Sequence, residues 1–183
     1  MTDRDALLER LRRDAWRRGR IRLASGRESD FFIDCKQVIL TGEGHRLVGS
    51  LLCDGILSRW PGDPPDGVAG VALGGCPLAS AVALTAALRG LVWDALYVRK
   101  EPKDHGTARR VEGRVGGARR VVLVEDVITT GGSSLAAVGA LKDEGFTVLG
   151  VLALVDREEG GMDTLGAAGV PATALFSRGD FLP

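Results

Sequence analysis

The chain has no net charge, no long apolar run and few cysteines, and each of these absences excludes a class of protein. Its 24 basic and 24 acidic side chains cancel across 183 residues. Nucleic-acid binders gain most of their affinity from clustered Lys and Arg, so we expect no nucleic-acid partner, whereas a small anionic ligand is compatible with this charge balance. A chain that is 45% hydrophobic is neither collagen-like nor disordered, and its length suits one domain with a good-sized core.

No stretch reaches the roughly 18 uninterrupted apolar residues that a membrane span requires. The charged N-terminal segment, MTDRDALLERLRRDAWRR, does not resemble a signal peptide, so we expect a cytoplasmic protein with no membrane partner. The three cysteines, Cys35, Cys53 and Cys76, are odd in number and lack a CxxC spacing. This pattern argues against both a disulfide framework and a zinc site.

Lysine and the side-chain amides are also scarce. Asparagine is absent, Gln37 is the single glutamine, and the four lysines are Lys36, Lys100, Lys103 and Lys142. Codon bias in a GC-rich genome explains this composition, with a warm habitat as the alternative explanation. Either way, each lysine in this arginine-rich chain is an informative residue. Glycine, in contrast, occurs 26 times, about twice its average usage, which predicts several sharp turns or close backbone approaches.

The first 40 residues predict a helix followed by a hairpin. A capping-box pattern, Thr2-x-x-Asp5, precedes apolar residues at helical spacing that stop before Gly19. Two short extended runs, over residues 20–23 and 31–34, are separated by turn-forming residues and predict two paired strands.

Beyond residue 40, helix and strand patterns alternate. The spacing predicts helices over residues 47–56, 77–88 and 133–144, and strands over residues 68–73, 92–98, 121–124 and 148–155. Strands that are apolar on both faces indicate an α/β fold with an open, mostly parallel sheet flanked by helices. We expect a single domain over residues 1–183, in which residues up to about 40 form the helix and hairpin and the rest form the α/β core. Residues 99–117 have almost no apolar side chains and predict a functional loop.

The most informative segment is VVLVEDVITTGGSS, residues 121–134. A buried strand there leads into a turn of Thr, Gly and Ser that opens a helix, so unpaired N–H groups and hydroxyls converge on one point. That combination predicts a phosphate site, although neither GxGxxG nor a P-loop motif is present. Glu125 and Asp126 would repel a phosphate unless sugar hydroxyls or a divalent metal lay between them. A ribose 5-phosphate meets this requirement, whereas a capping role for Asp126 is the structural alternative.

This segment resembles the signature of type I phosphoribosyltransferases, which bind 5-phosphoribosyl 1-diphosphate (PRPP). The resemblance implies that family's fold, with a small N-terminal hood. In the family, the loop holds the 5-phosphate and the acidic pair faces the ribose hydroxyls. The residues of this segment that the resemblance marks as PRPP ligands are Glu125, Asp126, Val127, Ile128, Thr129, Thr130, Gly131, Gly132 and Ser133.

The string RKEPKDHG, residues 99–106, contains two of the four lysines and one of the two histidines. A solvated charge run is the alternative to a functional loop. The string resembles the catalytic loop of orotate phosphoribosyltransferases, which closes over the site and contacts the diphosphate, reaching across a homodimer. The resemblance adds Arg99, Lys100, Lys103 and His105 to the PRPP ligands. It marks Lys103, Asp126 and His105 as catalytic, with Lys103 as the best candidate for stabilising the charge of the transition state.

On the base side, Arg157 follows the last predicted strand, and its planar fork suits a carboxylate such as that of orotate. The resemblance implies that Arg157 and Thr129 bind orotate; an exposed Arg157 paired with Glu158 or Glu159 is the alternative. Residues 25–32 resemble a hood segment over the base, although their aromatic pair could equally be hairpin core. Residues 70–79 resemble the pyrophosphate-binding loop.

Two positions depart from the family pattern. Many bacterial relatives carry substrate-binding lysines where this chain has Ala24 and Gly74. With these exceptions, the resemblance implies transfer of the phosphoribosyl group to orotate, with Mg²⁺ held mainly through PRPP rather than by direct protein ligands. Purine-specific phosphoribosyltransferases and non-catalytic PRPP-binding or nucleotide-binding regulators of the same fold are the alternatives.

Overall fold

The computed structural model describes residues 1–22, 28–101, 109–114 and 119–182, and its centre is a six-stranded sheet. The strand order is β5-β4-β3-β6-β7-β8, and all neighbours pair in parallel except β4 and β5. The strands are β3 (Gly67–Val71), β4 (Asp94–Val98), β5 (Val111–Glu112), β6 (Arg119–Ile128), β7 (Phe146–Asp156) and β8 (Ala172–Ser177). The predicted α/β class with a mostly parallel sheet is confirmed.

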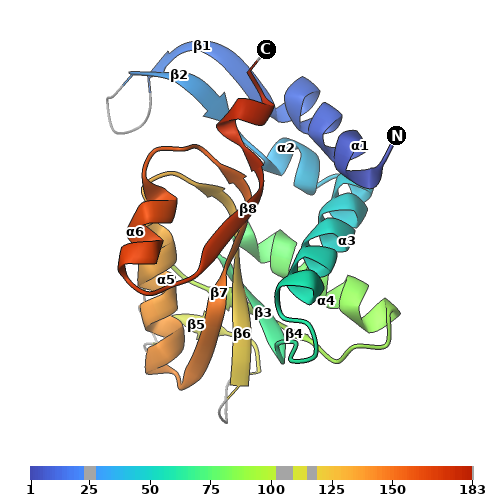
Figure 1. Ribbon diagram of the computed structural model, residues 1–183, viewed down its shortest axis with the longest axis vertical. Helices are drawn as coiled ribbons and strands as arrows, with labels where there is room; N and C mark the ends of the chain where they lie inside the picture. Colours follow the sequence, from blue (N-terminus) through green and yellow to red (C-terminus); the bar gives the residue numbers. More distant parts are fainter. Residues whose placement is uncertain (23–27, 102–108, 115–118, 183) are drawn as a thin grey trace.

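Helices cover both faces of this sheet (Figure 1). One face packs against α3 (Gly42–Arg59) and α4 (Gly75–Leu88), and the other against α5 (Gly132–Asp143) and α6 (Gly161–Ala167). Successive residues of β6 alternate between the two cores: Val122 and Val124 face α3 and α4, whereas Leu123 faces α5. This alternation sets the direction of every side chain farther along β6.

The N-terminal region forms the predicted helix and hairpin with shifted boundaries. Helix α1 (Asp3–Arg10) begins with the Thr2 capping box and continues as a π-helical turn, η1 (Leu11–Ala15). The chain then becomes extended at Trp16, directly after Ala15, the last apolar residue at helical spacing before Gly19. Strands β1 (Trp16–Arg22) and β2 (Glu28–Ile33) pair antiparallel. Buried Phe31 and partly buried Trp16 anchor this hairpin to the core. A four-residue helix, α2 (Lys36–Ile39), connects the hairpin to α3.

The C-terminal tail gave no usable pattern in the sequence, yet it completes the fold. Strand β8 forms one edge of the sheet and leads into a short 3-10 turn, η2 (Arg178–Asp180). Phe181 then packs edge-on against Phe31, with ring centroids 5.7 Å apart. The last strand thereby ties the hairpin to the α/β core.

Three predicted boundaries in the core were wrong. Strand β6 continues four residues beyond residue 124, because Glu125 and Val127 still pair with Ala153 and Val155 of β7. Residues 99–117, predicted to be irregular, include β5. Helix α4 begins at Gly75, two residues before Pro77. Within the described residues, no helix is both long enough and apolar enough to cross a membrane.

Candidate functional site

The predicted phosphate turn joins the end of β6 to the start of α5. Gly131 caps α5 with a φ of +81°, and a Cβ atom there would lie 2.8 Å from the Gly161 carbonyl oxygen. Only glycine adopts this conformation readily, and only glycine fits against α6. Thr130, Gly132 and Ser133 are exposed, beside the first-turn N–H groups of α5 that lack helical partners. The turn therefore offers an open anion-binding cradle.

Glu125 and Asp126 lie inside β6 and point to opposite faces of the sheet. Glu125 faces α5, where its Oε1 accepts a hydrogen bond of 3.2 Å from the Ser133 hydroxyl. Asp126 faces α4, and a Cβ atom on Gly74 would overlap its carboxylate. The sequence placed two acids next to the cradle; the structure adds that they serve different sides of it.

Burial raises the pKa of both carboxyl groups. Glu125 is 5% exposed, and this burial, together with the charge of Asp126, raises its pKa to about 8 despite the Ser133 hydrogen bond and the charge of Lys100. Its Oε2 has no hydrogen-bond partner among the described residues. Burial also raises the pKa of Asp126, opposed by the Val127 amide, which donates to Oδ1 at 3.0 Å, and by the charge of Lys36. A buried acceptor without a donor is well suited to a ligand hydroxyl.

The beginning of the cationic loop lies beside the cradle. Arg99, Lys100 and Arg110 line a pocket of about 220 Å³ together with Ser133 of α5. The guanidinium of Arg99 is held by Glu112 of β5, with Nε 2.8 Å from Oε1. The structure thus brings two predicted PRPP ligands together with a third. The predicted ligands Lys103 and His105 lie outside the described residues.

Arg157 connects the core to the hairpin rather than projecting into solvent. Its backbone N–H donates to the Ile128 carbonyl at 3.0 Å, and the residue is 8% exposed. Nη2 donates to the Phe31 carbonyl at 3.1 Å and pairs with Glu159 Oε1 at 2.7 Å. The ion pair considered as an alternative therefore exists, but in a buried place. Thr129 is half-buried at the end of the same edge, one residue after Ile128.

Residues 25–32 had two interpretations, a hood over the base or the core of the hairpin. Phe31 is fully buried in the aromatic core and Phe32 is half-buried, so Phe31 fits the hairpin-core alternative. Ala24 lies outside the described residues. At the pyrophosphate-type loop, Gly74 begins the turn into α4, and Cys76 is buried, which raises its thiol pKa.

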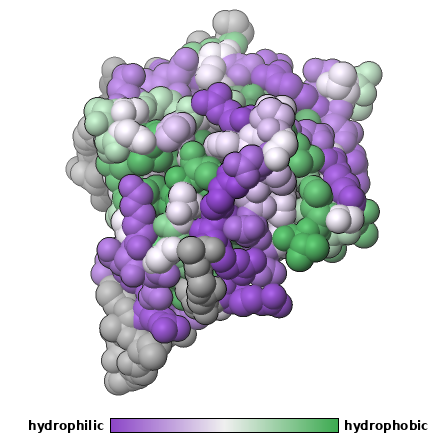
Figure 2. Space-filling model, turned by 60° about the horizontal axis from the view of Figure 1, so that its bottom comes forward, coloured by the Kyte–Doolittle hydropathy of each residue, from purple (hydrophilic) through white to green (hydrophobic). Residues whose placement is uncertain are grey.

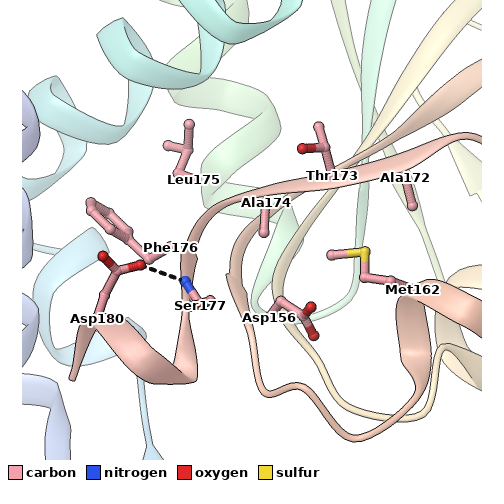
Figure 3. Close-up of a pocket in the computed structure, with 9 residues that line it drawn as sticks. All are labelled: Asp156, Met162, Ala172, Thr173, Ala174, Leu175, Phe176, Ser177 and Asp180. Carbon is pink, nitrogen blue, oxygen red and sulfur yellow. Dashed lines mark hydrogen bonds between the residues drawn. The ribbon is translucent and has the colours of Figure 1, made fainter. Parts of the chain in front are cut away.

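Sequence analysis missed Asp34, which lies just before α2, and Lys36, the first residue of α2; the charges of both act on Asp126. The Lys36 ammonium lies 2.5 Å from Asp34 Oδ1, and its charge acts on Asp126. The scarcity of lysine was the one signal that could have identified Lys36. A second hollow, of about 370 Å³, follows the edge strand β8 and includes Met162, Phe176 and Asp180 (Figure 3). None of the predicted ligands lines it, so the candidate site is the cradle at the ends of β6 and β7.

Comparison with known proteins identifies the class that this fold and cradle define. The phosphoribosyl transferase domain family matches residues 53–167, which include the pyrophosphate-type loop, the acidic pair and the cradle. The chain is therefore a phosphoribosyltransferase-family protein.

Relatives along the whole chain define the family more narrowly. An orotate phosphoribosyltransferase of Sorangium cellulosum is 55% identical, covering 100% of this chain and 94% of the relative. Among solved structures, orotate phosphoribosyltransferase of Mycobacterium tuberculosis in complex with Fe(III) dicitrate is 36% identical, with a TM-score of 0.83 and coverage of 98% and 99%. The same enzyme in complex with PRPP gives 33% identity and a TM-score of 0.81, again with coverage of 98% and 99%. The chain belongs to the orotate phosphoribosyltransferase family.

Proposed function

We propose that this protein transfers the 5-phosphoribosyl group of PRPP to orotate, giving orotidine 5′-monophosphate and pyrophosphate in the de novo synthesis of UMP. One observation carries the proposal: the open cradle at Gly131 directly follows an acidic pair whose Glu125 has a buried acceptor without a partner. A sugar phosphate supplies both the anion and the hydroxyl donors that this arrangement lacks. The full-length relatives and the solved PRPP complex support the same conclusion.

In this reaction a ring nitrogen of orotate attacks the anomeric carbon while the bond to the departing pyrophosphate oxygen breaks. The electron pair of that bond leaves with pyrophosphate, so positive charge develops on the ribose and negative charge on the leaving group. The ring nitrogen gives up its proton to solvent as the new bond forms. No covalent enzyme intermediate is needed, and the protein contributes position and charge. The cradle would fix the 5-phosphate, and Glu125 and Asp126 would accept hydrogen bonds from the ribose hydroxyls. Arg99 and Lys100, which line a pocket with Ser133, would meet the diphosphate.

The orotate carboxylate would bind Arg157. The guanidinium already holds a carboxylate, that of Glu159, at 2.7 Å, so its donors suit the carboxylate of a substrate. A purine lacks such a group, which favours orotate over a purine substrate. Lys103 and His105 complete the proposal as loop residues that screen the leaving group, with Lys103 contributing more to turnover than to affinity.

We expect Mg²⁺ to enter this site bound to PRPP. Mg²⁺ prefers six oxygen ligands and usually keeps several waters. In the described parts of the chain, no group of three or more potential ligand side chains could hold a metal. The diphosphate, the ribose hydroxyls and water would supply its oxygen ligands. The ion would neutralise charge on the departing pyrophosphate.

We further propose a cytoplasmic, single-domain enzyme that works as a homodimer with loop 99–117 shared across the interface. Support for the dimer comes from α4, where Leu84 and Leu88 share one exposed face, with Val92 following. Figure 2 shows an apolar patch on the right of the molecule, the side on which Figure 1 places α4.

A spectrophotometric assay tests the proposed function. Orotate absorbance should fall when the protein receives PRPP and Mg²⁺, and omission of Mg²⁺ should slow the reaction. Adenine, guanine and uracil serve as competing bases in parallel assays. Consumption of adenine or guanine instead of orotate would identify a purine enzyme, and PRPP binding without turnover of any base would identify a regulator.

A further inference from the structure

The N-terminus of α2 is packed against the acidic end of β6. Cys35 is fully buried, and its thiol lies 4.0 Å from the backbone carbonyl oxygen of Asp126. Lys36, the next residue, remains 39% exposed at its side chain, so it borders the site without being sealed inside the core. In Figure 1, α2 lies between the hairpin and the beginning of α3, on the side of the sheet where β6 ends.

Lys36 is held in one orientation by Asp34. Its ammonium lies 2.5 Å from Asp34 Oδ1, and Gln37 Nε2 donates to the other carboxylate oxygen at 3.1 Å. The hydrogen bond to Asp34 raises the pKa of Lys36, and the charge of Asp126 adds to this effect, so the side chain stays cationic. An ammonium has three donors, and the Asp34 contact uses one of them. The others are available to a ligand on the exposed side.

Position 74 cannot supply a cation beside Asp126 as the carboxylate now lies. A Cβ atom on Gly74 would overlap the Asp126 carboxylate, so any side chain at position 74 requires Asp126 to move. Asp34 and Asp126 are both negative, and without a cation they would repel a diphosphate arriving at the Gly74 loop. On the other face of β6, Lys100 already stands beside Glu125. Lys36 is the corresponding charge on the Asp126 face.

We propose that Lys36, at the start of α2, binds the diphosphate of PRPP and the product pyrophosphate and supplies the cation on the Asp126 side of β6. The inference rests on the proposed function and names a substrate-binding residue for it. Asp34 is then a positioning residue: it orients Lys36 and does not itself contact the substrate.

Substitution of Lys36 tests the proposal through the separate Michaelis constants. Lys36→Met should raise the KM for PRPP, and for pyrophosphate in the reverse reaction, by about tenfold or more, because a charge-assisted hydrogen bond is lost. The KM for orotate should change less than about twofold. Lys36→Arg keeps the charge and should recover most of the loss. Lys142→Met, the same change on the exposed end of α5, is the control and should match the wild type. An unchanged KM for PRPP in soluble Lys36→Met would overturn the proposal.

A second measurement needs no substitution. With four lysines in the chain, acylation of each can be followed by mass spectrometry with and without pyrophosphate and Mg²⁺. Pyrophosphate should slow the acylation of Lys36 and leave Lys142 unaffected; equal rates at Lys36 would refute the inference. Because pyrophosphate is the probe, protection of Lys36 in a protein that does not consume orotate would refute the proposed function alone. Orotate turnover without protection would refute the role of Lys36 alone.

Discussion

At the scale of single residues, the neighbouring acids Glu125 and Asp126 of β6 lie in two different environments. Glu125 shares its side of β6 with Ser133 and Lys100, whereas Asp126 shares its side with Gly74 and the α2 lysine. Strand alternation alone produces this division. A ribose at the end of β6 would therefore meet one carboxylate on each side, each with its own lysine nearby.

The raised pKa of Glu125 predicts how stability depends on pH. A folded-state pKa of about 8, above the ordinary 4.5, means that folded Glu125 retains a proton which the unfolded chain has released. Its contribution to the stability of the ligand-free protein is therefore fully present below about pH 4.5 and is lost as pH rises through about 8. Glu125→Gln should leave the melting temperature nearly unchanged near pH 5. Near pH 9 it should raise the melting temperature by several degrees, equivalent to roughly 2 kcal/mol.

Thermal melts of both proteins at the two pH values check this prediction. Glu9→Gln, the same change at an exposed position of α1, is the control and should show no pH-dependent difference. An equal effect of Glu125→Gln at both pH values would mean that Glu125 does not titrate in this window.

Substitution of Arg157 should weaken the binding of orotate selectively. Arg157→Lys keeps the charge but loses the planar fork that can hold a carboxylate and the Phe31 carbonyl together. The KM for orotate should rise by about tenfold to a hundredfold, and the KM for PRPP should change less than about threefold. Initial rates with each substrate varied in turn measure both values. Arg59→Lys, at the exposed end of α3, is the matched control; a rise confined to the PRPP constant would place Arg157 at the wrong substrate.

At the scale of elements, the β6–α5 junction depends on one left-handed glycine. Gly131→Ala places a side chain where φ is +81° and the Gly161 carbonyl oxygen lies 2.8 Å from the new Cβ. We expect a loss of about 1–3 kcal/mol in the free energy of unfolding and a higher KM for PRPP, because the cradle must deform. Gly139→Ala on the same helix meets nothing within 4 Å and should stabilise by up to about 1 kcal/mol. Urea unfolding measures the change in stability, and PRPP titration measures the change in affinity. Equal results for Gly131→Ala and Gly139→Ala would show that the cradle tolerates a side chain at position 131.

The elements that the sequence predicted well are those with a strong apolar pattern. Residues 121–124 and 148–155 form strands as expected, because they are apolar on both faces and lie at the centre of the sheet. Strand β8 gave no signal, since an edge strand of half-buried, mostly small residues shows neither alternation nor a solid apolar run. Helix α2 is four residues long, less than the length over which a helical period becomes visible.

The same reasoning explains which parts of the site were predictable. The Thr-Gly-Ser turn and Arg157 follow predicted strands directly, so their place at the carboxyl edge could be inferred from local sequence. The charge of Lys36 acts on Asp126 from 90 positions away in the sequence, across α2 and β6, and no local pattern encodes this proximity. Likewise, acidic residues are unfavourable in strands, so the extension of β6 through Glu125 depends on its pairing with β7.

At the scale of the whole molecule, the exposed face of α4 predicts self-association. Leu88 and Val92 are 80% and 85% exposed, which is costly for large apolar side chains unless a partner covers them. Leu88→Glu should convert a dimer into monomers in sedimentation equilibrium, since it introduces paired charges at a two-fold contact. Leu40→Glu, an equally large change at another exposed leucine, should leave the dimer intact. A wild-type protein that sediments as a monomer would contradict the dimer directly.

The proposed sharing of the loop between subunits is tested by mixing two inactive variants. Lys103→Ala should inactivate the loop and Asp126→Asn the site in the core, so each homodimer alone should be nearly inactive. If the loop of one subunit serves the site of the other, a mixed dimer contains one site with both residues intact. Random exchange makes half of the dimers mixed, each with one such site of two, so about a quarter of wild-type activity should return. Activity that stays at the sum of the two parents after exchange, with mixed dimers verified by mass, would show that each loop closes over its own subunit.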